Sequence, residues 1–196
     1  MKSPIEYGDP ENYTRIFREK YAQDDTWIKA FLQKAQIGHI ATHWETQPFI
    51  TPLLFWYAVD KHTIYVHTNL YGRLQANCEQ YPEACFEACE MGRLLPSNVA
   101  LEFGMQYASV VAFGKIRKVD DDEEKRFGLQ GLLDKYFPDL KAGVDYRPIL
   151  QEELEQTGVF AFEIESWSGK KNWKDSAKQS PDWKPLETSI LERYAK

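Results

Sequence analysis

The feature that most constrains the fold is a series of short β-like segments with little chain between them. Three of these lie in the first third of the sequence: Gly38–Trp44, Pro48–Tyr57 and Thr63–Thr68. Each is rich in β-branched and aromatic residues, and short polar turn regions separate them. Because parallel neighbours would need long crossover connections, these segments are expected to pair antiparallel, as a meander.

The rest of the chain adds further strands and several helices. Ala84–Met91, Tyr107–Val119 and Gly158–Glu165 also have extended patterns, and Leu94–Phe103 is expected to be a loop. Helical spacing or capping predicts four helices, which begin near Asp24, at Gly72, at the acidic run 120–124 and at Glu187. The fold class is therefore mainly β (α+β), a six-stranded antiparallel barrel with flanking helices.

The organisation predicted is a single domain over 1–196, with a barrel core and its helices over 24–165 and a C-terminal extension over 166–196. No internal repeat or linker-like tract divides the chain. The length of 196 residues is enough for one substantial core but short for two.

Charge and hydropathy disfavour several classes of partner. A formal net charge of -6 and a pI near 5.3 would repel a phosphate backbone, so no nucleic acid is expected. No apolar run is long enough to span a bilayer, and the polar N-terminus lacks a secretory apolar core. The expected location is the cytoplasm, with no membrane partner.

Two features resemble metal or redox sites without favouring that interpretation. Cys78, Cys85 and Cys89 lack the paired spacing of a zinc site and are expected to be reduced, although a functional Cys85/Cys89 pair is an alternative. The acidic run 120–124 suits a helix N-terminus better than a cation site, since consecutive acids point in different directions on a helix. No metal is expected.

The segment Thr63–Asn77 carries the most chemical information. A strand ends near His67 and Thr68, and Gly72-Arg73 then opens a helix. Helix N-terminal amides, a glycine that permits close backbone approach, an arginine and a hydroxyl together suit a phosphate. The alternative is an ordinary helix start with no ligand.

An ordered set of motifs gives this segment a context. In chain order the motifs are Gly38–Thr42, Pro48–Phe55, Thr63–Asn77, the strand Tyr107–Gly114, and a turn at Ser168–Lys171 after the last strand. From about Trp27 to Trp173 the chain resembles the FMN-binding split barrels related to pyridoxamine 5'-phosphate oxidase, in their nitroimidazole-reductase-like branch. The resemblance implies a split β-barrel that binds FMN, with FAD as a possible substitute, in a homodimer whose flavin lies at the subunit interface.

The resemblance also implies site residues. The isoalloxazine ring would lie along Phe49, Ile50, Thr51 and Pro52. The ribityl phosphate would be surrounded by His67, Thr68, Gly72, Arg73 and Leu74. Tyr107 and Ser109 would approach from the strand that builds the dimer, and Lys170 and Trp173 would close the site.

Each of these assignments has a simpler alternative. His67 could be a satisfied interior histidine, and Thr51-Pro52 could be a strand irregularity. Ser109 could be a small residue at a crowded interface, and Trp173 could merely cover the barrel end.

The chain also departs from the family pattern in two places. Leu74 stands where many relatives carry a second basic residue, so phosphate binding would depend on fewer charges. Lys170, Lys171, Asn172 and Trp173 replace the arginine and histidine cluster of true pyridoxamine-phosphate oxidases, so oxidation of vitamin B6 is not expected.

The leading functional hypothesis is an FMN-dependent oxidoreductase that reduces or oxidises a small flat compound, aromatic or nitro-bearing. The cofactor would carry the chemistry, and His67 is the candidate for proton transfer. The alternative is a non-catalytic protein that stores or senses a flavin, haem or pyridoxal phosphate. A third hypothesis is a dimeric interaction module that has lost its ligand.

Overall fold

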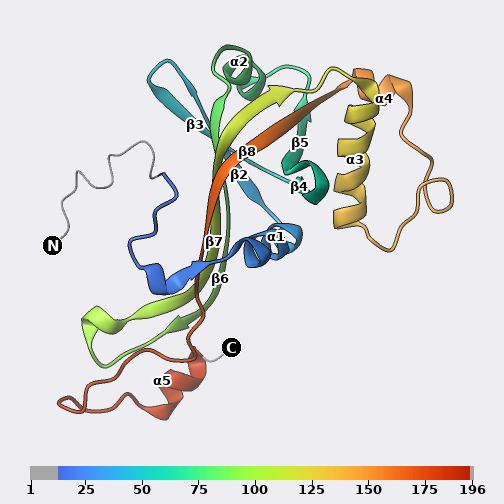
Figure 1. Cartoon of the computed structure of the whole chain (residues 1–196). Coiled ribbons are helices and arrows are strands. Elements are labelled where there is room, and N and C mark those ends of the chain that lie inside the picture. The colour runs from blue at the N-terminus through green and yellow to red at the C-terminus, as the bar shows by residue number, and fades with distance from the viewer. Residues whose placement is uncertain (1–12, 195–196) are drawn as a thin grey trace.

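A curved antiparallel sheet organises the part of the chain that the computed structural model describes, residues 13–194 (Figure 1). The strands are β1 (Ala22–Gln23), β2 (Gly38–Trp44), β3 (Gln47–Leu53), β4 (Phe55–Ala58), β5 (Thr63–Asn69), β6 (Glu83–Leu95), β7 (Gly104–Lys118) and β8 (Thr157–Asn172). The helices are α1 (Asp25–Lys34), α2 (Arg73–Gln80), α3 (Asp122–Tyr136), α4 (Gln151–Glu155) and α5 (Thr188–Arg193), with short 3-10 turns at Glu19–Tyr21, Val59–Lys61 and Ala100–Glu102. The strand order is β3-β2-β6-β7-β8-β5-β4, and β1 pairs with β8.

The sheet curls around one apolar interior. Its two outermost strands, β3 and β4, follow each other directly in the chain at Leu54, so the connection itself closes the barrel. The rings of Phe55 and Phe86 meet across the interior at 4.8 Å. Strand side chains fill this core together with Ile28, Phe31 and Leu32 of α1 and Leu74 and Cys78 of α2. Burial of these apolar surfaces is the main source of stability.

Helix α3 packs against the outer side of β4 and β5, and two glycines determine how closely it approaches. A Cβ atom at Gly131 would lie 2.1 Å from the ring of Trp56, and one at Gly128 would lie 2.8 Å from the ring of Tyr65. These two positions therefore allow two large aromatic side chains to pack directly on the helix backbone.

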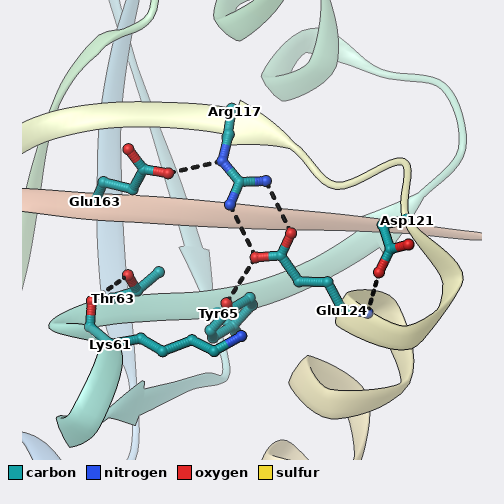
Figure 2. Close-up of polar contacts among 7 residues, drawn as sticks. All are labelled: Lys61, Thr63, Tyr65, Arg117, Asp121, Glu124 and Glu163. Atoms are coloured by element: carbon teal, nitrogen blue, oxygen red, sulfur yellow. Dashed lines mark hydrogen bonds and ion pairs between the residues drawn. The ribbon is translucent and has the colours of Figure 1, made fainter.

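Polar contacts fix the first turn of α3 to the sheet (Figure 2). Asp121 caps the helix by accepting a hydrogen bond from the backbone amide of Glu124 at 2.8 Å. The Arg117 guanidinium on β7 donates to both carboxylate oxygens of Glu124, at 2.8 and 3.1 Å, and to Glu163 on β8 at 2.7 Å. The Tyr65 hydroxyl on β5 donates to the same Glu124 carboxylate at 2.7 Å. Three strands and one helix thus share a single carboxylate and its guanidinium partner.

The split-barrel class predicted from the sequence is confirmed, with differences in detail. The sheet has eight strands instead of six, because Pro48–Tyr57 divides at Leu54 and a two-residue strand joins β8. The turn predicted at Ser168–Lys171 is wrong: β8 continues to Asn172 and pairs with β7 over that stretch. Part of the predicted loop Leu94–Phe103 is also strand or 3-10 turn. Among residues 13–194, no helix is both long and apolar enough to cross a membrane.

Candidate functional site

The first part of the predicted site is the α2 corner, where β3 meets the start of α2. The Arg73 guanidinium lies over the rings of Phe49 and Trp44, with its central carbon 4.8 and 6.0 Å from their centroids. Gly72 caps α2 without a side-chain hydrogen bond, so the first amides of the helix have no intrahelical acceptor. A Cβ atom at Gly72 would meet nothing within 4 Å, which shows open space in front of these amides. The corner offers a cation and free N–H groups to an anion.

Two further residues predicted for this corner have limited roles. Leu74 is only 4% exposed and belongs to the barrel core, so it can offer a ligand its backbone amide but not its side chain. The Thr68 hydroxyl donates to the carbonyl of Asn69 at 2.9 Å, and its oxygen can still accept a hydrogen bond. Both residues stay within the same part of the fold as Arg73.

Strand alternation separates His67 from this corner. The side chains of Ile64 and Val66 enter the barrel core, whereas Tyr65 packs beneath α3. His67 follows Tyr65 on that second face and lines a chamber under α3 and α4. The imidazole keeps a solvent-accessible edge, yet desolvation by the surrounding protein lowers its pKa below the ordinary value of 6.5. His67 is therefore neutral at pH 7 and does not face the same space as Thr68.

The second group of predicted residues lies on the lower halves of β7 and β8. Ser109 is directly opposite Lys170, and the ammonium of Lys170 lies 5.4 Å from the ring centroid of Tyr107. Trp173 follows β8 and lines a groove of about 230 Å³ beside Trp27 of α1. Aromatic rings and lysine ammonium groups thus share this end of the sheet.

An open face of the sheet connects β3 with β7 and β8. We define it by the outward residues of the five strands from β3 to β8: Ile50, Pro52, His39, Ala41, Cys85, Glu87, Cys89, Tyr107, Ser109, Val111, Phe113, Ser168 and Lys170. Ile50 is 69% exposed, and none of the helices α1, α3 and α4 lies on this side of the long strands (Figure 1). The N-terminal segment covers part of the face, since the ring of Tyr13 lies 5.4 Å from that of Phe113 and the ring of Tyr21 lies 6.5 Å from that of Tyr107. Phe49 and Thr51 point to the other face of β3.

One chain does not bring all predicted residues to one place. Thr68 pairs with Gly158 at the start of β8, and Lys170 lies twelve residues further along the same strand (170 − 158). At a rise of roughly 3.3 Å per residue, about 40 Å of strand separates these two positions. Thr68 and Lys170 therefore cannot both contact one small ligand within a single chain.

The chamber beside His67 was not predicted from the sequence. Its walls include Leu129, Leu132 and Leu133, whose helical spacing had already indicated an apolar face of α3. The missing information was the path of residues 137–150, which fold back so that Phe137, Tyr146 and Ile149 complete the walls.

Comparisons with known proteins define the class. A model of the pyridoxamine 5'-phosphate oxidase family matches residues 24–171, which is more than half of the chain. The chain therefore belongs to this family of flavin-binding split barrels. No curated protein matches the sequence.

Solved structures support the same fold. The flavocytochrome Anf3 from Azotobacter vinelandii has a TM-score of 0.73 at 21% identity, covering 92% of this chain and 96% of that one. A FAD and haem binding protein from Mycobacterium smegmatis has a TM-score of 0.70 at 20% identity, covering 89% and 97%. A candidate 5-nitroimidazole antibiotic resistance protein from Bacteroides thetaiotaomicron has a TM-score of 0.62 at 20% identity, covering 77% of this chain and 90% of that one. At these identities the likeness establishes the fold.

Proposed function

We propose that this protein is a homodimeric flavin-nucleotide-dependent oxidoreductase that acts on a small flat compound. The observation that carries the proposal is the division of the candidate residues on one chain. Thr68, which precedes the α2 corner in the chain, and Lys170 are separated by about 40 Å of strand, whereas Ile50 of β3 shares the open face with Ser109 and Lys170. In a dimer formed through the open face, the α2 corner of one chain would meet Ser109 and Lys170 of the other.

The residues of the α2 corner fit a flavin nucleotide. Arg73 and the free amides of α2 would hold the phosphate of FMN, or the first phosphate of FAD. Strand β3 pairs only with β2 among the described strands, so the outer edge of β3 has unpaired backbone groups for the pyrimidine edge of the ring. Phe49 and Ile50 add apolar surface on the two faces of that strand. When bound, the flavin supplies the electron transfer, and these residues position it.

The solved neighbours support this class of activity. Proteins described as a flavocytochrome and as FAD and haem binding share the fold over most of both chains, and one neighbour is described in terms of nitroimidazole resistance. A flavin is common to the first two descriptions, and a nitroimidazole is a small flat compound. A second ligand beside the flavin is compatible with the same fold.

The first test is the visible absorption spectrum of the freshly purified protein, followed by identification of any ligand released on denaturation. A flavin spectrum is expected, with Arg73→Ala retaining flavin at least about tenfold less tightly because a charge-assisted phosphate contact is lost. Arg193→Ala is the matched control, since Arg193 lies on α5, which carries none of the candidate residues. A colourless protein that also fails to bind added FMN or FAD would refute the proposal.

A further inference from the structure

A mostly apolar chamber beside the sheet is separate from the α2 corner. It lies under α3 and α4, over the paired end of β5 and start of β8, and has a volume of about 510 Å³. Its apolar walls are Leu54, Leu129, Leu132, Leu133, Phe137 and Ile149. This volume falls in the range of pockets that bind small molecules, and the walls suit a flat hydrophobic ligand.

The polar groups of the wall are almost all used within the protein. Arg147 donates to both oxygens of Glu153 at 2.8 and 2.9 Å, which neutralises its charge. The Tyr146 hydroxyl accepts from Gln130 at 2.9 Å, and the Thr157 hydroxyl donates to the carbonyl of Glu153 at 2.7 Å. Tyr136 donates its hydroxyl to the carbonyl of Gln36 at 2.7 Å. Each of these groups therefore already has a hydrogen-bond partner within the protein.

His67 is the exception. Within residues 13–194 its imidazole has no hydrogen-bond, ion-pair or ring partner, although it lines the chamber. A neutral imidazole carries one N–H donor and one nitrogen lone pair. Because His67 is partly open to solvent, both are within reach of a molecule that enters the chamber. Because desolvation lowers the pKa of His67, the lone pair is available at neutral pH.

We propose that this chamber is a second ligand site, distinct from the flavin site, for a flat and mostly apolar molecule that presents one electron-pair acceptor to His67. Two sources share this chemistry: a metalloporphyrin, whose iron would accept the imidazole nitrogen, and an organic ring with a hydroxyl or N–H donor. Since the only cation of the wall, Arg147, is paired with Glu153, any anionic groups of the ligand would remain at the open mouth. The assignment goes beyond the proposed flavin chemistry and does not depend on it.

The residues that line the chamber include none of those that form the α2 corner. His67 and Thr68 are consecutive residues of β5 whose side chains point to opposite faces, so the chamber and the space that Thr68 faces lie on opposite sides of this strand.

The test is a titration of the protein as purified with two probes, haemin followed by its absorption band and 2-naphthol followed by its fluorescence. At least one probe is expected to bind with one site per chain. His67→Ala should weaken that binding at least about tenfold, since the contact to the imidazole is lost. Leu133→Trp should do the same by filling the chamber, and His43→Gln, which alters a histidine on β2 outside the chamber, should have no effect.

The pH dependence gives an independent readout. Binding should be constant above pH 6.5 and should weaken as the pH falls through the lowered pKa of His67, because protonation removes the lone pair. Haemin binding alone would identify a metalloporphyrin site, and 2-naphthol binding alone an organic one. Binding of neither probe, or binding unaffected by both substitutions, would overturn the assignment. Absence of flavin from the purified protein would count against the proposed function only.

Discussion

Glu124 shows how much of this fold depends on individual side chains. Its carboxylate accepts hydrogen bonds from Arg117 and Tyr65, and the bond from Arg117 is the main cause that lowers its pKa below the ordinary 4.5. A carboxyl group whose pKa is lower in the folded state stabilises the protein above pH 4.5, and this stabilisation is lost as the pH falls through the folded pKa. Sequence had identified Glu124 only as part of an acidic helix start.

Replacing Glu124 with Gln should lower the free energy of unfolding at pH 7 by about 1 to 3 kcal/mol, the range for hydrogen bonds to charged groups. The difference from the unmodified protein should shrink as the pH falls below 4.5, because the carboxyl group is protonated first in the unfolded chain and, at lower pH, in the folded protein as well. Urea unfolding at pH 7 and pH 4 measures both effects. Glu123→Gln changes an exposed neighbour in the same turn and should have little effect at either pH. An equal loss at both pH values would contradict the ionic role.

At the scale of elements, the position of α3 is determined by close contact between its backbone and two aromatic rings. Gly131→Ala would place a Cβ 2.1 Å from the Trp56 ring, so the helix or the ring must move. We expect a loss of about 1 to 3 kcal/mol in thermal or urea unfolding, typical of overpacking. Gly104→Ala is the control, because a Cβ there meets only one backbone oxygen at 3.9 Å. Unchanged stability of the Gly131 variant would show that α3 can move freely.

Sequence patterns predicted those elements whose side chains alternate between core and surface. Strand β2 has the predicted limits, Gly38–Trp44, because its inward residues are all apolar or small. The continuation of β8 to Asn172 was missed because its Ser, Gly and Lys residues are typical of turns, and only pairing with β7 keeps them extended. The chamber beside His67 was missed because its walls depend on where residues 137–150 fold, which no local sequence pattern predicts.

At the scale of the whole molecule, the open face is the surface through which the proposed dimer would form. His39 and Glu87 contact at 2.9 Å near its centre, in a row with Pro52, Val111 and Ser168. Apolar and small residues around one histidine–glutamate hydrogen bond are a suitable surface for a second copy of the chain. A dimer through this face would give two equivalent flavin sites, each with the α2 corner of one chain and the β7/β8 group of the other.

This arrangement predicts complementation between two inactive variants. Arg73→Ala and Lys170→Ala should each lose flavin as homodimers, because every site would lack one of the two contacts. In a mixed dimer with one chain of each kind, one site would combine two intact halves and the other two altered halves. Differently tagged chains, co-expressed and purified as the mixed dimer, should therefore bind one flavin per dimer with the affinity of the unmodified protein. If both residues instead came from the same chain, every site of the mixed dimer would carry one substitution and none would recover, so flavin stoichiometry distinguishes a shared site from a site within one chain.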